Sequence, residues 1–390
     1  MNKNERKIVG AENSGDVIKH TRLESRRSIL KKAVGWGALA STAGLGLNML
    51  RPRSAEAAEP IKWKAQGAWM PGPGHHIESA DYFANALNRI SGGTLLIPRM
   101  HSAGELVGTL EANNAVSAGK LDAVHGSMLY SVGKIPEAGF VVGTQASPIK
   151  SYHELLAWWW ANLDLYSNYL QEKGYNLVSF PCGLIESEPV WSNKPIRTLK
   201  DFKGLKIRTS GLSLDFYQRL GCSPVTMPLS EVVPSLEKGV IDACEWCLPY
   251  TDYPAGVHKT CQYALTGLIH EPSLCLELLV NLNSWNKLSP QQKQLVKDAV
   301  QITNAHYLTD VTTYNVETWP KMIKEGKKGG LIVSKADAEM QKRCFEVGSA
   351  MAKDWSAKNS WVKKIVASQT EWHNKFADYF GTYYRLGYPA

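Results

Sequence analysis

"GLKIRTSGLSLDFYQRLGCSPVTMPLSEVVPSLEKGVIDACEW", residues 204–246, alternates between strand-like and helix-like stretches. The pattern predicts a strand, a helix, an extended stretch, a second helix and a final strand, over residues 204–211, 212–221, 223–228, 230–240 and 241–246. Short strands that alternate with helices are typical of α/β domains, in which helices cover a mainly parallel sheet. The last strand ends at Glu245 and Trp246, where such domains place ligand-binding residues.

The rest of the chain downstream of residue 60 shows the same alternation. Residues 76–91 carry apolar side chains at helical spacing, so they predict a helix. Ser289, Pro290 and Gln292 are the N-cap, first-turn proline and capping-box residues of a long helix that we expect to reach residue 319. We also expect strands over residues 61–69, 94–102, 121–127 and 273–283, a helix over 105–120, and helical structure from 335 to the end.

Two α/β lobes followed by a long helical tail are therefore the expected architecture. A cleft between two such lobes is a common ligand site, because the carboxyl ends of parallel strands face it. Arg208 lies near the end of one predicted strand, and its planar guanidinium suits bidentate binding of a carboxylate. A surface arginine in an ion pair is the other interpretation of Arg208.

The first 57 residues have the features of an export signal. Arg26 and Arg27 precede a glycine-rich apolar run, and Ala55 and Ala57 form an A-x-A-like cleavage site. The arginine pair predicts a twin-arginine signal, and hence a periplasmic protein that starts near residue 58. An uncleaved membrane anchor over residues 33–50 is the alternative.

The basic character of the chain belongs mostly to this leader. Residues 1–57 contain 11 of the 44 Lys and Arg residues and 5 of the 36 Asp and Glu residues, which leaves residues 58–390 with a net charge of about +2. A nearly neutral protein gives no support to binding of nucleic acid or of an anionic membrane. Because no later run approaches 18 uncharged apolar residues, we expect residues 58–390 to form a soluble protein.

Seven cysteines would usually form disulfides in an oxidising compartment, although an odd number leaves at least one unpaired. They lie at positions 182, 222, 244, 247, 261, 275 and 344. The pair Cys244 and Cys247 forms one CxxC motif without a second pair or a suitably spaced histidine, which argues against zinc. Pro249 and Pro254 oppose the long helix that a thioredoxin-like redox site requires.

Several blocks of sequence resemble one family, the solute receptors of TRAP (tripartite ATP-independent periplasmic) transporters. They are "SGGTLLIPRMHSAGELVGTLEANNAVSAGKLDAVHGSMLYSVGKIP" (91–136), "KPIRTLKDFKGLKIRTSG" (194–211), "LGCSPVTMPLSEVVPSLEKGVIDACEW" (220–246) and "LLVNLNSWNKLSPQQKQLVKDA" (278–299). The blocks occur in the family's order and cover nearly all of the chain after the leader.

The resemblance implies an α/β, two-lobed periplasmic solute-binding fold with hinge strands and long C-terminal helices. It places lobe I at residues 58–184 and 273–312 and lobe II at 185–272. Residues 313–390 would form a helical segment that packs on the lobes. It also implies that a small organic carboxylate binds between the lobes and is delivered to a TRAP membrane permease.

The resemblance also assigns roles to individual residues. Arg208 would clamp the ligand carboxylate. Glu245 and Trp246 match the branch that binds 2-oxo or 2-hydroxy carboxylates with a metal cation, through the glutamate side chain, the tryptophan main-chain carbonyl and the tryptophan ring. Glu271 would complete the cation site. Ligation by oxygen alone suits Ca²⁺ or Na⁺ better than zinc.

The chain departs from that branch before Trp191. The family commonly has a glutamine there, whereas this chain offers Glu186, Ser187 and Glu188. We expect Glu188 to contact the substrate, with solvated loop charges at 186 and 188 as the equal alternative. The family also indicates Tyr130 and Asn281 as further ligand contacts.

Two aromatic or histidine-containing runs have no role assigned by the resemblance. His75 and His76 are expected near the start of a helix at the cleft edge, and the tryptophans at 158–160 are expected in the core. The many tryptophans leave room for an aromatic or bulky acid as well as a ligand the size of pyruvate or lactate. Large rings also recur in the C-terminal segment, where they predict a helical stripe and, by resemblance, a homodimer: Trp355, Trp361, Ile365, Trp372, Phe376, Tyr379 and Phe380.

A receptor is thus the leading interpretation, and no catalytic residue is expected. The chain lacks a nucleophile elbow, a P-loop, an HExxH motif and a dinucleotide-binding glycine motif. Two alternatives remain at this point. One is an exported redox or metal-dependent enzyme that uses the CxxC motif or the carboxylates, and the other is a receptor that acts as a sensor without a permease.

Overall fold

The computed structural model describes residues 59–72, 74–131, 133–227 and 229–383. The predicted leader, with its arginine pair and its cleavage site, lies outside these residues. Among the described residues, no helix has both the length and the apolar character that crossing a bilayer requires.

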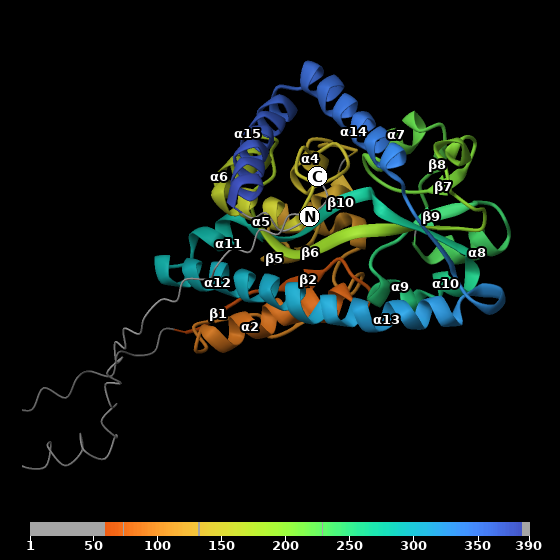
Figure 1. Ribbon diagram of the computed structural model, residues 1–390. Coiled ribbons are helices and arrows are strands. Elements are labelled where there is room, and N and C mark those ends of the chain that lie inside the picture. The colour runs from red at the N-terminus through yellow and green to blue at the C-terminus, as the bar shows by residue number, and fades with distance from the viewer. Residues whose placement is uncertain (1–58, 73, 132, 228, 384–390) are drawn as a thin grey trace, which may run out of the picture. The chain divides into compact units, whose positions relative to one another are not determined.

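One large sheet organises the described chain, with strand order β4-β2-β5-β10-β6-β9-β7-β8 and β11 paired to β10 (Figure 1). Strands near its two ends pair in parallel, as predicted, but β10 pairs antiparallel with both β5 and β6. The sheet is therefore mixed. Its strands are β2 (Ala65–Gly67), β4 (Met100–His101), β5 (Ala123–Gly126), β6 (Leu177–Ser192), β7 (Lys206–Arg208), β8 (Ser223–Val225), β9 (Ala243–Glu245), β10 (Tyr263–Asn281) and β11 (Ile332–Lys335). A separate small sheet pairs β1 (Ile61–Lys62) with β3 (Leu95–Leu96).

The two long strands β6 and β10 connect the ends of the sheet. At one end β10 pairs with β5 through residues 277–280, and at the other end it pairs with β11 through residues 263–266. Strand β6 pairs with β9 only through residues 190–192. Between these ends the pairing of β6 with β10 has register shifts, so the middle of both strands is irregular.

Helices cover both faces of the β5 end of the sheet (Figure 1). Side chains of β6 and β10 alternate between two hydrophobic clusters, one shared with α2 and α12 and the other with α5 and α6. The helical elements here are η1 (His76–Asp81), α2 (Tyr82–Ile90), η2 (Thr109–Glu111), α3 (Ala112–Ser117), η3 (Met128–Ser131), α4 (Ala138–Val141), α5 (Tyr152–Ala161), α6 (Leu163–Glu172), α11 (Leu282–Asn286) and α12 (Pro290–His306). Trp158 and Trp159 are fully buried, which confirms their predicted place in the core.

The β8 end carries shorter helices and its own apolar cluster around Trp191. These elements are η4 (Leu199–Phe202), α7 (Ser213–Arg219), α8 (Leu229–Glu237), α9 (Pro249–Ala255), α10 (Val257–Thr260) and η6 (Lys327–Gly329). Helix α9 follows the CxxC motif and is only seven residues long, as the two prolines predicted.

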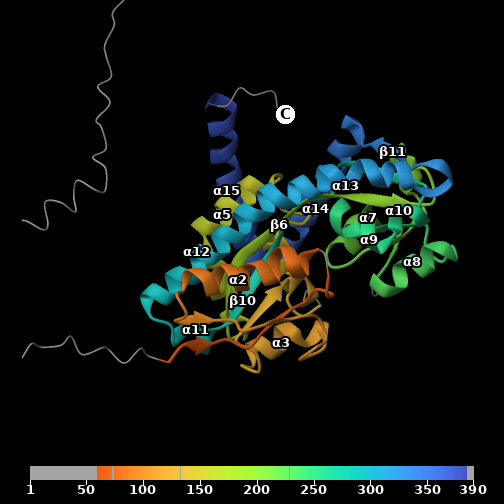
Figure 2. The same cartoon turned by 90° about the horizontal axis from the view of Figure 1, so that it is seen from below.

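One long, continuous helical segment runs along both ends of the sheet. Helix α12 continues through a π-helical turn, η5 (Tyr307–Val311), into α13 (Thr312–Glu325). Its start confirms the predicted cap, because Ser289 Oγ accepts a hydrogen bond from the Gln292 N–H in a capping box. Helix α12 packs on α2, and α13 packs on α9 (Figure 2).

The C-terminal segment forms α14 (Ala338–Lys358) and α15 (Ser360–Tyr383), as predicted. The predicted aromatic stripe is partly packed against the rest of the protein and partly exposed. Trp355 packs edge-on against Phe140, Trp361 Nε1 donates to Glu172 Oε1 at 2.8 Å, and the side chain of Ile365 is fully buried. In contrast, Tyr379 is 48% exposed, and the end of α15 extends away from the sheet (Figure 2).

Three local expectations differ from the structure. The strand expected over residues 61–69 is split around the buried Trp63 into β1 and β2. The helix expected over 105–120 is regular only in α3, because the extended Gly108 precedes a 3₁₀ turn. All seven cysteines are buried and unpaired, so the expected disulfides are absent from the described residues, which include every cysteine.

Candidate functional site

Arg208 and Glu245 meet at the ends of neighbouring parallel strands. Strands β7 and β9 pair with Arg208 opposite Cys244, so the next residue, Glu245, lies beside the guanidinium. Arg208 Nη1 donates to Glu245 Oε1 at 2.8 Å, and Nε donates to the Met227 carbonyl at 3.3 Å. Both side chains of this ion pair are buried.

Three further polar side chains converge from the middle of β6 and β10. Glu188 and His270 are cross-strand partners, and Glu271 follows His270. His270 Nε2 lies 3.5 Å from Glu188 Oε2, 3.9 Å from Glu245 Oε2 and 4.0 Å from Glu271 Oε2. Glu188, His270 and Glu271 each offer a ligand atom, and these atoms lie within 4.8 Å of one another.

The convergence of His270 and Glu271 depends on an irregular backbone. In a regular strand, consecutive side chains point to opposite faces of the sheet. Here Glu271 has φ +39°, the one positive φ outside glycine among the described residues, and the β6–β10 register shifts on both sides of His270. Such a conformation costs about 1–3 kcal/mol and persists where the surrounding structure imposes it, often at binding sites.

Burial sets the electrostatics of this group. Burial raises the pKa of Glu188 well above its usual range, and the charges of Glu271 and Glu245 add to the rise. The pKa of Glu271 is raised to about 8 by burial and by Glu245. Burial, and secondarily the charge of Arg208, lowers the pKa of His270 to about 3, so the imidazole is neutral at pH 7. Arg208 alone does not balance three buried carboxyl groups.

This donor set fits a bound cation. A cation would favour the ionised form of Glu188, Glu245 and Glu271, which burial alone disfavours. Their carboxylate oxygens are ligands that Ca²⁺ and Na⁺ accept. Trp246 directly follows Glu245 in the chain. Its side chain is half-buried and packs against two of the hydrophobic clusters.

A second layer of hydrogen bonds holds the site. His270 Nδ1 lies 3.0 Å from the Tyr217 hydroxyl and 3.2 Å from Gln145 Nε2. The rings of His270 and Tyr217 also stack on each other. Ser213 Oγ donates to Glu271 Oε1 at 3.1 Å and also contacts the Gln145 amide. These residues fix the orientation of His270 and Glu271.

Partly exposed rings lie beside the polar group. Trp69 contacts both Tyr130 and His75 through its ring, and His75 Nε2 lies 3.0 Å from Cys247 Sγ. Tyr130 is 41% exposed, yet desolvation of its hydroxyl, and then the charges of Cys247 and the buried glutamates, raise its pKa to about 12.

Asn281 lies apart from these residues. It is the last residue of β10, and its Oδ1 accepts hydrogen bonds from the main-chain N–H groups of Asn283 and Ser284. Its Nδ2 donates to the Val116 carbonyl at 2.8 Å. The side chain therefore caps α11 and is not brought to the polar group. The side chain of Glu186, the other candidate beside Glu188, lies outside the described atoms.

Sequence reasoning missed several residues of the site that carry no motif: His270, Gln145, Ser213, Tyr217 and Asp252. Asp252 is fully buried and accepts hydrogen bonds from Trp191 Nε1 at 2.7 Å and from Thr251 Oγ1 at 3.2 Å. His270 directly precedes Glu271, which was a usable signal, although two consecutive residues of a regular strand point to opposite faces of the sheet.

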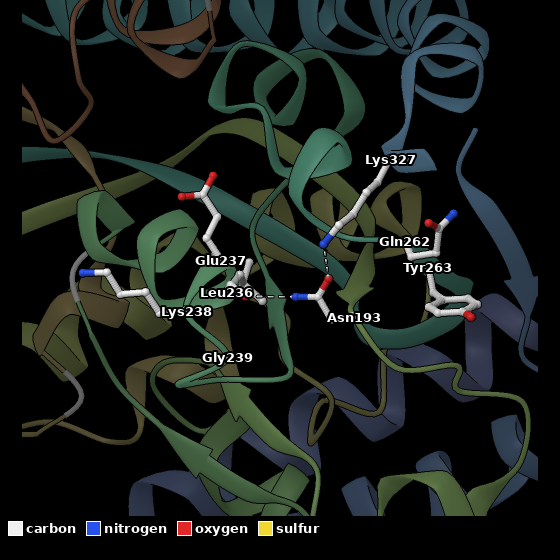
Figure 3. Close-up of a pocket in the computed structure, with 8 residues that line it drawn as sticks. All are labelled: Asn193, Leu236, Glu237, Lys238, Gly239, Gln262, Tyr263 and Lys327. Carbon is white, nitrogen blue, oxygen red and sulfur yellow. Dashed lines mark hydrogen bonds between the residues drawn. The ribbon is translucent and has the colours of Figure 1, made fainter. Parts of the chain in front are cut away.

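A surface pocket of about 440 Å³ lies elsewhere, between α8 and the start of β10 (Figure 3). Lys327 Nζ donates to Asn193 Oδ1 at 3.3 Å across it. Its lining residues are Asn193, Leu236, Glu237, Lys238, Gly239, Gln262, Tyr263 and Lys327. None of the converging carboxylates lines it, so the buried polar group is the better candidate for a specific site.

Comparison with known proteins identifies the family of this chain and relatives that are similar to it over much of its length. Residues 74–359 match the family model for bacterial extracellular solute-binding protein, family 7 (DctP). A monocarboxylate 2-oxoacid-binding periplasmic protein of a Nostoc species is 30% identical over 305 residues, which is 78% of this chain and 82% of the Nostoc protein.

Two solved structures share the fold. A TRAP transporter solute-binding protein of Bordetella bronchiseptica, a dimer with copurified calcium and picolinate, is 24% identical with a TM-score of 0.74, over 83% of this chain and 95% of its own. A TRAP solute-binding protein of Pseudoalteromonas atlantica with bound sodium and pyruvate is 23% identical with a TM-score of 0.74, over 83% and 97% of the two chains. The predicted α/β solute-binding fold with long C-terminal helices is confirmed.

Proposed function

Because this chain belongs to the DctP family of bacterial extracellular solute-binding proteins, we propose that it binds a small 2-oxo or 2-hydroxy monocarboxylate together with a cation. The chain is a periplasmic TRAP receptor and not an enzyme, as the resemblance predicted. The alternative of an exported redox or metal-dependent enzyme is therefore wrong.

One observation carries the proposal: three buried carboxyl groups surround His270 Nε2, and a single guanidinium accompanies them. A cation bound by Glu245 and Glu271 would offset the buried negative charge. The ligand carboxylate would then bind between this cation and Arg208, whose described contacts use Nε and Nη1 and leave Nη2 for the ligand.

The other predicted residues complete the proposed site. The main-chain carbonyl of Trp246 serves as a cation ligand and its ring as a wall of the pocket. Glu188 and Tyr130 face the bound acid from β6 and from the end of η3. Asn281 is left out of the proposal, because its hydrogen bonds are used within its own turn.

A titration of carboxylates tests the function. Chelator-treated protein is titrated with pyruvate and lactate in sodium-free buffer, and then with Ca²⁺ or Na⁺ restored. We expect tight binding only with the cation, and binding at 100 times the Kd should stabilise the fold by about 2.7 kcal/mol. Full-affinity binding without any cation would rule out the cation bridge. Glu245→Gln should weaken both cation and carboxylate binding.

We propose that the lobes follow the predicted bounds, with residues 58–184 and 273–312 in lobe I and 185–272 in lobe II. The long strands β6 and β10 fit the role of hinges, because β10 pairs with β5 at one end and β11 at the other, and β6 runs beside it and pairs with β9 at one end only. Closure of the lobes about these strands would enclose the ligand, and a TRAP permease would receive it. The twin-arginine leader over residues 1–57 belongs to the same proposal.

We also propose a homodimer formed through the end of α15. Phe376 and Phe380 stack at 4.3 Å there, next to the exposed Tyr379, and a similar protein from Bordetella bronchiseptica is a dimer. Exposed rings in a cluster are typical of interfaces. Deletion of α15 would not test the dimer alone, because it also removes the buried Ile365 from the core.

Sedimentation equilibrium of wild type and Phe376→Asp gives a cleaner result. Wild type should be dimeric at micromolar concentration, and the variant should be monomeric with unchanged carboxylate affinity. A monomeric wild-type protein contradicts the dimer, and a dimeric variant places the interface elsewhere.

A further inference from the structure

His270 supplies a nitrogen atom where the sequence indicated oxygen ligands alone. Its Nε2 faces oxygens of Glu188, Glu245 and Glu271 at 3.5–4.0 Å, and its ring is 1% exposed. A hydrogen bond between a neutral imidazole and a carboxylate is usually 2.7–3.2 Å long. These contacts are therefore longer than hydrogen bonds, and they separate the atoms as ligands around a common ion are separated.

The spacing admits a bound cation. Ligand atoms placed tetrahedrally at ~2.1 Å from an ion lie about 3.4 Å apart, close to the 3.5 Å between His270 Nε2 and Glu188 Oε2, whereas the 4.0 Å to Glu271 Oε2 must shorten when so small an ion binds. For His270 to lie beside Glu271 in this way, the backbone at Glu271 adopts φ +39°. The strand thus presents two consecutive side chains to one point.

The surroundings of Nδ1 permit Nε2 to act as a ligand. A ligating nitrogen must be unprotonated, so Nδ1 must carry the hydrogen and donate it. The Tyr217 hydroxyl at 3.0 Å accepts such a bond, and the Gln145 amide at 3.2 Å accepts it when its oxygen faces the ring. With the amide in that orientation its nitrogen occupies the other position, 3.1 Å from Ser213 Oγ, and donates to it, and the Ser213 hydroxyl donates to Glu271 Oε1.

We propose that His270 Nε2 ligates the cation together with Glu188 and Glu271, and that the site therefore takes a first-row divalent metal ion in preference to Na⁺ or Ca²⁺. The inference rests on the function proposed above and refines its cation site: Glu188 becomes a metal ligand, and Glu245 stays paired with Arg208. Mixed imidazole and carboxylate ligation suits ions such as Zn²⁺ and Mn²⁺, whereas Ca²⁺ and Na⁺ prefer oxygen alone.

The first test is a difference in metal affinity between wild type and His270→Gln. Both chelator-treated proteins are titrated calorimetrically with Zn²⁺ and with Ca²⁺. Since glutamine keeps an oxygen donor and loses the nitrogen donor, we expect Zn²⁺ affinity to fall at least tenfold and Ca²⁺ affinity to change less than threefold. Equal loss of both affinities would assign His270 a structural role and overturn the proposal.

The second test observes the nitrogen directly. Pulsed EPR of the Mn²⁺-loaded wild type should show coupling to a ¹⁴N nucleus, which disappears in His270→Gln. His258→Gln is the matched control. His258 is also fully buried, but it lies in α10, where its ring stacks on that of Tyr253 from α9. The control should keep the coupling. Coupling that is absent in wild type, or that persists in His270→Gln, overturns the proposal.

A carboxylate titration in the same Ca²⁺-loaded and Zn²⁺-loaded samples distinguishes failure of the metal-ligand proposal from failure of the proposed function. Binding of pyruvate to Ca²⁺-loaded wild type together with an absent ¹⁴N coupling leaves the receptor function standing and rejects His270 as a ligand. Present coupling without binding of any tested carboxylate supports the metal ligand and contradicts the proposed solute class.

Discussion

Replacement of Arg208 by methionine should move the affinities for carboxylate and cation in opposite directions. The guanidinium contacts Glu245 at 2.8 Å, and the other oxygen of Glu245 lies 3.9 Å from His270 Nε2. The positive charge is thus within about 9 Å of the point where the cation is proposed to bind. Two unit charges at that separation repel by about 1.8 kcal/mol at an effective dielectric constant of 20.

Arg208→Met removes this repulsion, so Ca²⁺ affinity without ligand should rise roughly twentyfold. Carboxylate affinity at saturating Ca²⁺ should fall by a few hundred to several thousandfold, because a buried carboxylate loses its charged partner. Calorimetric titrations with Ca²⁺ and then with pyruvate measure both effects. Arg219→Met is the control, since Arg219 pairs with Asp215 and the exposed Asp354, and both affinities should stay within twofold.

A parallel fall of both affinities in Arg208→Met would refute this reasoning, because it would mean that the variant disturbs the whole site. Near-normal carboxylate binding would place the ligand carboxylate away from Arg208. Thermal unfolding of the chelator-treated variant checks that the fold is retained.

Two further predictions concern stability. Burial raises the pKa of Glu277 from 4.5 to about 7, so the stability that its neutral form contributes is fully present below pH 4.5 and is lost as the pH rises through 7. In urea unfolding from pH 5 to 8, the free energy of unfolding of Glu277→Gln should therefore fall less with pH than that of wild type, by at most about 3 kcal/mol. Parallel pH dependence of the two proteins would contradict this. A Cβ at Gly348 would lie 2.1 Å from the Gln145 carbonyl oxygen, so Gly348→Ala should lower the free energy of unfolding by about 2 kcal/mol or more. Gly108→Ala, which meets open space at negative φ, should change it by less than about 0.5 kcal/mol, and equal effects of the two variants would argue against close packing of α14.

Local sequence patterns predicted much of the fold because they depend on near neighbours. The helical spacing over residues 76–91 and the cap at Ser289 need only a few adjacent residues to form. The strand over residues 273–283 was recognised, but its extension back to Tyr263 was not. Its pairing with the long strand β6 depends on residues about 70 to 100 positions away.

The sequence by itself determined the family and the α/β solute-binding fold and suggested roles for Arg208, Glu245 and Glu271, because the motifs behind them are contiguous in the chain. Only the tertiary structure decided which side chains meet. The register of β6 against β10 brings Glu188 opposite His270, and a positive φ turns Glu271 toward the same point.

Tertiary packing also decided the fate of other predicted groups. Asn281 caps a helix, seven buried cysteines stay apart, and the aromatic stripe of α15 is half core and half surface. The physical reason is common to these cases. A side chain's neighbours are fixed by contacts between distant segments, and spacing along the chain carries little information about such contacts.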